Sequence, residues 1–291
     1  MHRRSLLHVG CTALRVSDRI PYGSLPISKR CASTSTPLTS SSTCIFVVPK
    51  VPDPTLSVLG SDQRFPVRRI YCVGQNYRAH ALEMGSNPDR SPPFFFTKPR
   101  DAAVDTSGTG AKIPYPSQTE DLHHEVELVV AIGQGGRGIR SDVALKHVFG
   151  YGVGVDLTRR DMQAAAKKAG KPWDCSKGFD SSAPVGMLTP ARQMILEAGF
   201  ETGFEKRSIC LEVDGVVRQE SVLGDMIWTI PEMISGLSEL FTLEPGDVLF
   251  TGTPAGVSAL EVGNAVEAKV EGLESCCFEV APSLPPTSRG V

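Results

Sequence analysis

The sequence has no long hydrophobic run and no strong excess of charge. After the first 44 residues, no segment approaches the roughly 20 uninterrupted apolar residues of a transmembrane helix. The formal net charge is −2 over 291 residues, and 21% of the residues are charged. These values favour neither a nucleic acid nor an acidic membrane surface as a partner. We therefore expect a globular protein that binds neither a membrane nor a nucleic acid.

The eight cysteines lack the spacing of a zinc or redox site. Cys11, Cys31 and Cys44 lie near the N-terminus, and the other five form no CxxC pair. Free thiols in a reducing compartment are therefore expected.

Acidic residues are scarce at the N-terminus. Residues 1–44 hold six Lys and Arg, nine serines and a single acid, Asp18, so they carry +5 and the rest of the chain −7. An Arg-rich, Ser-rich and acid-poor leader is typical of an organellar transit peptide. We therefore predict a mitochondrial protein, or a cytoplasmic one if residues 1–44 are only a disordered leader.

The rest of the chain divides into three parts by composition. Residues 45–66 are punctuated by proline and are expected to pack on the main domain as a lead-in. Residues 67–281 form the predicted main domain, and residues 282–291 a loose C-terminal tail.

Strand patterns outnumber helix patterns in the predicted domain. The sequence predicts helices over 79–85, 141–149, 161–170 and 229–243, the last with Thr229 and Glu232 at capping-box spacing. It predicts strands in 68–77, 92–104, 122–133, 151–156 and 247–257, and a hairpin over 208–220 about Asp214 and Gly215. Such a pattern predicts a mainly β fold, a rolled and largely antiparallel sheet with a few packed helices.

Two acidic residues interrupt the most apolar of these strands, in the segment LHHEVELVVAIG. Residues i and i+2 share one face of a strand, so Glu125 and Glu127 would crowd together there. Burying both carboxylates is unfavourable unless a cation or hydrogen-bond donors compensate. Asp156 ends the GVGV strand, which can lie beside the first. The three carboxylates would then form an oxygen-rich site for Mg²⁺, Mn²⁺ or Ca²⁺. Alternatively, one glutamate points to solvent or meets an arginine.

Neighbouring motifs allow two other interpretations. His123 and His124 suggest zinc, although no HExxH accompanies them, and one of them could instead hydrogen-bond to a metal ligand. Gly133, Gly135 and Gly138 match the G-x-G-x-x-G of dinucleotide-binding proteins. No long helix follows these glycines directly, so we favour a glycine-rich hairpin.

Two further groups have the chemistry of a catalytic site. His80 and Glu83 are three residues apart and share one face of the predicted short helix, where a carboxylate can orient an imidazole as a general base. Lys98 in FFFTKP and Lys177 in CSKGF could stabilise a developing oxyanion. A solvated histidine and two surface lysines are the plainer alternatives.

These motifs together resemble the fumarylacetoacetate hydrolase superfamily. The resemblance covers about residues 45–280 and rests on six blocks in order: VGQNYRAHALEMG, PPFFFTKP, LHHEVELVVAIG, GYGVGVDLTRRDMQ, KPWDCSKGFDSSAPVG and GDVLFTGTPAGV. The segments FPVRRIYCVG and PWDCSKGFD are most similar to acylpyruvate hydrolases, in particular bacterial-type fumarylpyruvate hydrolases. The sequence departs from the family pattern at Gln75, Cys175 and Ser176, which bear on substrate choice.

The resemblance implies a mixed β-roll, usually a homodimer, with Mg²⁺ or Mn²⁺ held by the positions of Glu125, Glu127 and Asp156. It also implies a mobile lid that carries His80 and Glu83. Substrate contacts would come from Lys177, Gln163 and Thr253.

The implied reaction is hydrolysis of a carbon–carbon bond in an acylpyruvate, a small 2,4-dioxo acid such as fumarylpyruvate, as in aromatic catabolism. We assign His80, Glu83 and Lys177 to catalysis, and Lys98, Gln163 and Thr253 to substrate binding. Oxaloacetate decarboxylation or keto-enol tautomerisation is the alternative reaction. A non-catalytic, metal-stabilised binding protein is disfavoured, because every matched catalytic position holds a competent residue.

Overall fold

The structure is a computed structural model that describes residues 46–87, 92–196 and 203–285. The predicted leader, residues 1–44, lies outside the described residues, and so does the predicted tail beyond residue 285. Residues Val51–Val291 form one compact unit. Within the described ranges, no helix is long and apolar enough to span a membrane.

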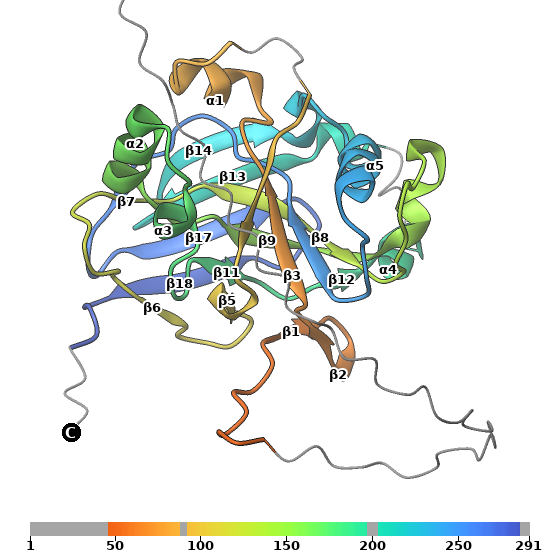
Figure 1. The fold of residues 1–291 in the computed structure, drawn as a ribbon, viewed down its shortest axis with the longest axis horizontal. Helices are drawn as coiled ribbons and strands as arrows, with labels where there is room; N and C mark the ends of the chain where they lie inside the picture. The colour runs from red at the N-terminus through yellow and green to blue at the C-terminus, as the bar shows by residue number, and fades with distance from the viewer. Residues whose placement is uncertain (1–45, 88–91, 197–202, 286–291) are drawn as a thin grey trace, which may run out of the picture. The chain divides into compact units, whose positions relative to one another are not determined.

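The largest element of this unit is an eight-stranded mixed sheet (Figure 1). Its strands follow the order β4-β3-β15-β8-β9-β11-β5, and β12 also pairs with β9. Their bounds are β3 (Arg69–Val73), β4 (Phe95–Lys98), β5 (Ala103–Asp105), β8 (Val126–Ile132), β9 (Val148–Val155), β11 (Ala183–Val185), β12 (Thr189–Pro190) and β15 (Asp247–Phe250). Most pairs are antiparallel, while β3 with β15 and β5 with β11 run parallel.

A five-stranded sheet packs against β8 and β9. It has the order β14-β13-β17-β18-β6, with β6 (Lys112–Pro114), β13 (Ser208–Val213), β14 (Val216–Val222), β17 (Ala265–Val270) and β18 (Cys276–Ala281). The predicted hairpin is β13–β14, and its turn residues Asp214 and Gly215 both have positive φ, as that turn requires. The fold is therefore mainly β, as the sequence predicts.

Strand β8 is central because both of its faces are buried. Leu128, Val130 and Ile132 join the core shared by the two sheets, while Val129 and Ala131 face a second core. The second core is closed by the hairpin of β1 (Thr55–Val58) and β2 (Ser61–Pro66), which contributes apolar side chains such as Leu56. An uninterrupted apolar run is what a strand buried on both sides requires.

The prediction of one strand over 122–133 is wrong. The segment forms β7 (Leu122–His123), which belongs to a small sheet with β10 (Thr158–Arg159) and β16 (Ala259–Leu260), and then β8 in the large sheet. The chain leaves β7 at His124, whose N–H donates to the carbonyl of Ser258. This break brings the chain from one sheet to another immediately before Glu125.

Helices cover the ends and edges of the sheets. They are α1 (Arg78–Glu83), α2 (Arg160–Ala169), α3 (Asp174–Lys177), α4 (Ala191–Leu196) and α5 (Ile230–Leu240). The Thr229 N–H donates to the Glu232 carboxylate at 3.0 Å, and this confirms the predicted capping box of α5. The predicted α-helix over 141–149 is instead a 3₁₀-helix, η2 (Ser141–His147), and the side chain of Ser141 does not cap it. Shorter 3₁₀ turns are η1 (Arg100–Ala102), η3 (Phe204–Lys206) and η4 (Leu223–Asp225).

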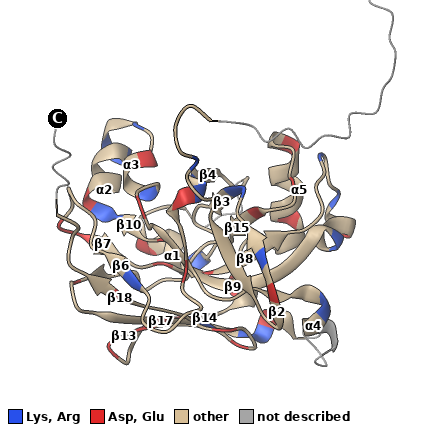
Figure 2. Ribbon diagram, turned by 90° about the horizontal axis from the view of Figure 1, so that it is seen from below, with Lys and Arg blue, Asp and Glu red and all other residues tan. Residues whose placement is uncertain are grey.

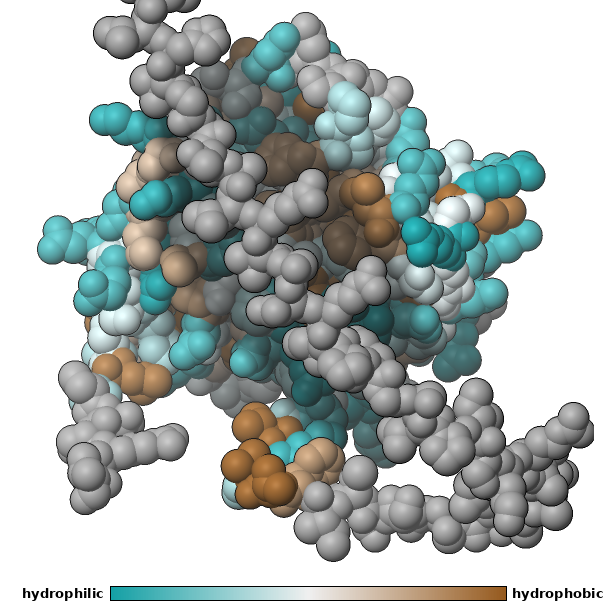
Figure 3. All heavy atoms as spheres, in the orientation of Figure 1, coloured by the Kyte–Doolittle hydropathy of each residue, from teal (hydrophilic) through white to brown (hydrophobic). Residues whose placement is uncertain are grey.

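Charged residues lie mostly on the outer elements, with both signs interspersed, whereas the central strand β9 carries none (Figure 2). On the face seen in Figure 1, hydrophilic atoms form much of the rim and apolar atoms gather toward the middle (Figure 3). Helices α1, α2 and α3 lie at one end of the large sheet, where they frame the site described next (Figure 1).

Candidate active site

Three buried carboxylates meet where β8 begins and β9 ends. The two strands are antiparallel with Val126 opposite Val155, so Glu125 and Asp156 occupy adjacent positions just beyond the pairing. The Asp156 N–H donates to the Glu125 carbonyl at 2.8 Å. One carboxylate oxygen from each of Glu125, Glu127 and Asp156 lies within 4.8 Å of the others. This carboxylate triad shows the convergence expected from the sequence.

Two lysines lie against the triad. The Lys177 ammonium, in α3, donates to Glu125 Oε2 at 2.8 Å and to Asp156 Oδ2 at 2.7 Å. Lys98, at the end of β4, forms an ion pair with Asp156 Oδ1 at 2.7 Å and donates to the carbonyl of Lys177. Both lysines are at most 3% exposed, so the alternative of surface lysines is wrong.

The charges in this cluster strongly perturb one another. Burial, with Asp156 and Glu125 close by, raises the pKa of Glu127 well above its usual value. Burial alone would also raise the pKa of Glu125, but Lys177 and Arg160 lower it below its usual range. Burial opposes the charge of Lys177, yet Asp156 and Glu125 raise the pKa of that ammonium. Two of the carboxylates therefore have cationic partners, and Glu127 is the carboxylate with a deficit of positive charge.

Arg160 is a site residue that our sequence analysis missed. At the start of α2, its guanidinium donates to Glu125 Oε1 at 2.5 Å and to Gln163 Oε1 at 2.6 Å. Arg160 thus bridges a triad member and a predicted substrate-binding residue. An arginine partner for one glutamate was the alternative to a metal site, and in the structure Glu125 both meets Arg160 and belongs to the triad. The RRD segment at residues 159–161, shortly after Asp156, is the sequence signal that could have indicated Arg160.

His80 and Glu83 form a hydrogen-bonded pair on α1. The distance from His80 Nδ1 to Glu83 Oε2 is 3.1 Å, and Glu83 Oε1 accepts from the Gly256 N–H at 3.1 Å. An ionised carboxylate can only accept hydrogen bonds, so in the bond to Glu83 the proton is on His80 Nδ1. The lone pair of a neutral His80 is then on Nε2. His80 is buried, so the alternative of a solvated surface histidine is wrong.

The loop after β15 contributes to the site from the other side. The Gly252 N–H donates to Glu127 Oε2 at 2.5 Å. Gly252 has φ +95°, and a Cβ added there would lie 2.6 Å from the Cβ of Asn76, so the position requires glycine. The next residue, Thr253, accepts a hydrogen bond at Oγ1 from the Gln219 amide at 2.8 Å.

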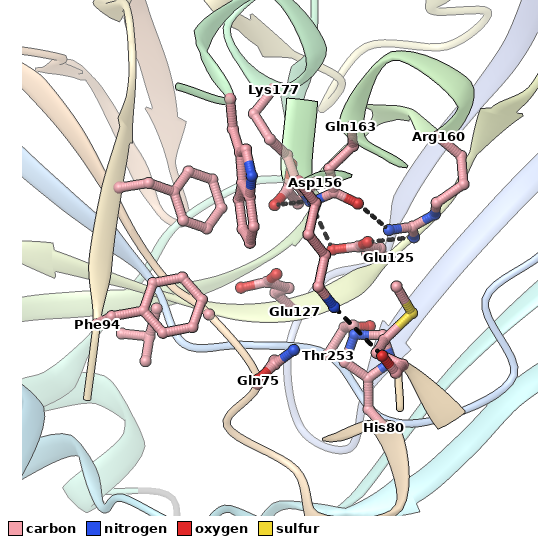
Figure 4. Close-up of a pocket in the computed structure, with 16 residues that line it drawn as sticks. Gln75, His80, Phe94, Glu125, Glu127, Asp156, Arg160, Gln163, Lys177 and Thr253 are labelled. Atoms are coloured by element: carbon pink, nitrogen blue, oxygen red, sulfur yellow. Dashed lines mark hydrogen bonds and ion pairs between the residues drawn. The ribbon is translucent and has the colours of Figure 1, made fainter. Parts of the chain in front are cut away.

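One pocket joins these groups (Figure 4). Seven of the nine predicted site residues line it: His80, Glu125, Glu127, Asp156, Gln163, Lys177 and Thr253. The other two, Lys98 and Glu83, do not line the pocket but contact residues that do: Lys98 pairs with Asp156, and Glu83 is hydrogen-bonded to His80. An aromatic wall of Phe94, Phe96 and Trp173 closes one side, with the Trp173 ring centroid 5.7 Å from that of Phe94. We did not predict this wall, because aromatic residues in a sequence usually indicate a core.

The two histidines before the triad form no zinc site. His124 is bonded through both ring nitrogens, to Gln219 Oε1 and to Ser258 Oγ, each at 2.9 Å. Burial lowers the pKa of His124 to about 4, so its ring is neutral near pH 7. His123 contacts Asp121 at 2.9 Å. The carboxylate triad is the one metal-competent cluster of three or more such side chains in the described residues.

The G-x-G-x-x-G segment has no dinucleotide-binding geometry. Gly133, Gly135 and Gly138 lie in the connection between β8 and β9, and the N–H of Gly133 donates to the carbonyl of His147 across it. The segment leads into the 3₁₀-helix η2, so no α-helix N-terminus faces the glycines. The connection is a glycine-rich hairpin loop.

Known proteins share both the sequence and the fold. The family model for the C-terminal domain of fumarylacetoacetate (FAA) hydrolase matches residues 69–281. The chain belongs to the fumarylacetoacetate hydrolase family. It is 38% identical over 220 residues to the mitochondrial oxaloacetate tautomerase FAHD1 of Arabidopsis thaliana, which covers 76% of this chain and 94% of that protein.

Two fumarylpyruvate hydrolases of this family are also similar. The Ralstonia enzyme is 36% identical over 202 residues, which cover 69% of this chain and all of that protein. The crystal structure of the Pseudomonas aeruginosa enzyme, in complex with Mn²⁺ and pyruvate, is 46% identical with a TM-score of 0.77, and covers 82% of this chain and all of that one. Family membership and the FAA hydrolase-type fold are therefore established, and relatives with two different reactions lie at comparable distances.

The triad of this family member fits a hard divalent cation. All its donor atoms are carboxylate oxygens, the ligands that Mg²⁺ and Mn²⁺ prefer. Among the described residues, the Gly252 N–H is the hydrogen-bond donor to Glu127, and no cationic side chain pairs with this buried carboxylate. A bound cation would supply the positive charge that Glu127 lacks.

Proposed function

We propose that this protein is a metal-dependent hydrolase that cleaves the carbon–carbon bond of an acylpyruvate, with fumarylpyruvate as the model substrate. The observation that carries the proposal is one pocket with three components: a triad for a divalent cation, a histidine oriented as a base, and a buried lysine. Hydrolysis of a 2,4-dioxo acid needs all three. The complex of the Pseudomonas relative with Mn²⁺ and pyruvate supports it, since pyruvate is a product of this reaction.

Glu125, Glu127 and Asp156 would hold Mg²⁺ or Mn²⁺. The bound ion would supply Lewis acidity to the 2-oxo and carboxylate oxygens of the substrate. Arg160 and Lys177 keep Glu125 ionised and in place, and Lys98 forms an ion pair with Asp156. The aromatic wall would limit access of bulk water on one side of the pocket.

His80 is the proposed general base. Glu83 holds its Nδ1–H, so Nε2 can take a proton from a water molecule. The water oxygen then bonds to C4 of the substrate and the C3–C4 bond breaks. The bonding electron pair moves into the enolate of pyruvate, and C3 takes up the proton that His80 removed from the water. The new carboxyl group loses its proton to solvent, and fumarate and pyruvate leave. The Lys177 ammonium would stabilise the enolate oxygen.

A second candidate uses the same pocket on oxaloacetate. The similarity to the Arabidopsis oxaloacetate tautomerase favours it. Tautomerisation needs a group that moves a proton at C3, which His80 can provide, and no water needs to attack. Decarboxylation needs only the stabilised enolate. The two candidates therefore differ in substrate and in the need for an attacking water.

The test follows the enol absorbance of fumarylpyruvate with the full chain. We expect rapid loss of absorbance with Mn²⁺ or Mg²⁺, no loss with EDTA, and a decrease in kcat of roughly 10²–10⁴-fold in His80→Ala. His147→Ala is a matched control, because His147 hydrogen-bonds to a carbonyl on the β8–β9 connection and is not a pocket residue. Consumption of oxaloacetate with fumarylpyruvate left intact would reject the hydrolase in favour of the second candidate.

The N-terminal leader motivates a proposal on localisation. The mitochondrial name of the Arabidopsis relative agrees with the basic, acid-poor composition of residues 1–44. We expect residues 1–44 fused to a fluorescent protein to direct it to mitochondria. A fusion that stays in the cytosol would reject the transit peptide.

A further inference from the structure

Gln219 lies outside the pocket lining but uses its whole hydrogen-bonding capacity on groups around the pocket. It is a buried residue of β14. Its Oε1 accepts from the Val126 N–H at 3.0 Å and from His124 Nδ1 at 2.9 Å. Its Nε2 donates to Thr253 Oγ1 and to the Pro254 carbonyl, both at 2.8 Å. A single amide thus connects the start of β8 with the loop after β15.

The orientation of this amide is determined by two backbone groups. The Val126 N–H can only donate, so it must face the amide oxygen. The Pro254 carbonyl can only accept, so it must face the amide NH₂. A flipped amide would set its NH₂ against the Val126 N–H and its oxygen against the Pro254 carbonyl, and leaving these buried groups without partners is unfavourable. The NH₂ group therefore faces Thr253.

This orientation determines the role of the Thr253 hydroxyl. Because Oγ1 accepts from Gln219, its own proton is not needed for that contact. Thr253 lines the pocket beside the triad, and in the described part of the chain Gln219 is the hydrogen-bond partner of its hydroxyl. The proton is thus available to an acceptor in the pocket.

We propose that Gln219 is a positioning residue that makes the Thr253 hydroxyl a hydrogen-bond donor toward the pocket, so that this position selects a carboxylate or another anionic oxygen. The inference rests on the proposed function, in which the ligand is a 2-oxo acid. It assigns a specificity role to a β14 residue more than 30 positions from Thr253 in the chain. Thr253 would then recognise a ligand carboxylate only while Gln219 presents its NH₂ group.

Gln219→Glu is the sharpest test because it keeps size and shape. One carboxylate oxygen of the glutamate can still accept from Val126 and His124. The other oxygen takes the place of the Gln219 NH₂ group, so an acceptor replaces a donor opposite Thr253. The Thr253 hydroxyl would then donate to that oxygen and turn away from the pocket. We expect pyruvate binding to the Mn²⁺-loaded full chain to weaken roughly 10- to 100-fold, the usual effect of losing a hydrogen bond to a charged group. Mn²⁺ should still bind, as the three carboxylates of the triad are unchanged.

A double-mutant cycle separates positioning from general damage. Thr253→Val should weaken pyruvate binding by a similar factor, and adding Gln219→Glu to it should cause little further loss. With fumarylpyruvate as substrate, KM should rise more than kcat falls, because the contact is made in both the bound and the transition state. Gln193→Glu is the matched control, since Gln193 also donates to a backbone carbonyl but does not line the pocket.

Several outcomes would overturn the inference. Wild-type pyruvate affinity in Gln219→Glu would do so, as would an equally large effect of this change in the Thr253→Val background. If the Gln219→Glu protein does not fold, Gln219→Met takes its place in the cycle, and its effect must also vanish in the Thr253→Val background. If the wild-type protein with Mn²⁺ does not bind pyruvate, the proposed function itself is wrong and the inference falls with it.

Discussion

Two lysines of this protein each lie between two carboxylates, in opposite environments. Lys177 meets Glu125 and Asp156 at 2.8 and 2.7 Å, and its side chain is 3% exposed. Lys269, on β17, meets Glu212 and Glu267 at 2.9 and 3.0 Å, and its side chain is 35% exposed. The two clusters contain the same kinds of charged group at nearly the same distances, so they differ mainly in how deeply they are buried.

Burial changes what such a cluster can do. Around Lys269, water screens the charges, and exposed ion pairs of this kind contribute little to stability. Around Lys177, the same charges are removed from water, which is costly unless each has its partners. A buried, acid-rich cluster therefore contributes little to the free energy of unfolding. The proposed function accounts for the Lys177 cluster, whereas the Lys269 cluster is an ordinary feature of an exposed sheet surface.

The strongest test of this contrast removes one carboxylate from each cluster. Asp156→Asn should lower fumarylpyruvate turnover roughly a thousandfold, because it removes a cation ligand and a partner of Lys98 and Lys177. It should also destabilise the metal-free protein by about 3–5 kcal/mol, as the buried Lys98 loses its carboxylate partner and the buried Lys177 loses one of two. Enzyme assays and denaturant unfolding would measure both effects.

Glu267→Gln is the control on the surface cluster, and we expect turnover and the unfolding midpoint to remain at wild-type values. An equal loss of turnover in the two variants would mean that burial does not distinguish the clusters.

The second test exchanges each lysine for methionine, which keeps length and removes charge. Lys177→Met should lower kcat roughly 10²- to 10³-fold if the ammonium stabilises the enolate. Lys269→Met should leave kcat unchanged. Retention of full activity by Lys177→Met would assign that lysine to structure alone.

The third test adds the cation. A ligand at 100 times its Kd stabilises a folded protein by about 2.7 kcal/mol. For a unit of this size, Mn²⁺ should then raise the melting temperature of the wild type by roughly 5–10 °C. Glu267→Gln should show the same rise and Asp156→Asn almost none. A rise of equal size in Asp156→Asn would place the ion elsewhere.

The smallest effect expected is that of salt. The Debye length falls from about 10 Å at 0.1 M to about 3 Å at 1 M, so salt screens exposed pairs. Any small difference in melting temperature between Lys269→Met and the wild type should vanish at about 1 M NaCl. The difference caused by Lys177→Met should persist, since solvent ions do not reach that cluster. If salt abolished both differences, the pocket charges would be more hydrated than their burial indicates.

Features encoded in neighbouring residues could be predicted from the sequence. The capping box of α5 needs only Thr229 and Glu232, and the β13–β14 turn needs only Asp214 and Gly215. The convergence of the triad could also be predicted, because an acid just before one strand and another just after its antiparallel neighbour must meet. Each of these inferences depends on local spacing or on a single strand pairing.

Features that depend on distant segments could not be predicted. The break of the expected strand at His124 depends on Ser258, 134 residues away. The contact between Arg160 and Glu125 requires α2 to pack near the end of β9. The ion pair between Lys98 and Asp156 joins β4, an edge strand of the large sheet, to the end of β9.

By itself, the sequence determined the classes of element, the motifs of the family and the identity of the acids, bases and lysines in the site. The tertiary structure alone decided which charges are buried, which carboxylate lacks a cation, and which way the Gln219 amide points. The physical reason is that backbone propensity and turn chemistry act within a few residues. Desolvation, ion pairing and the matching of donors to acceptors depend on groups that the fold brings together from far apart.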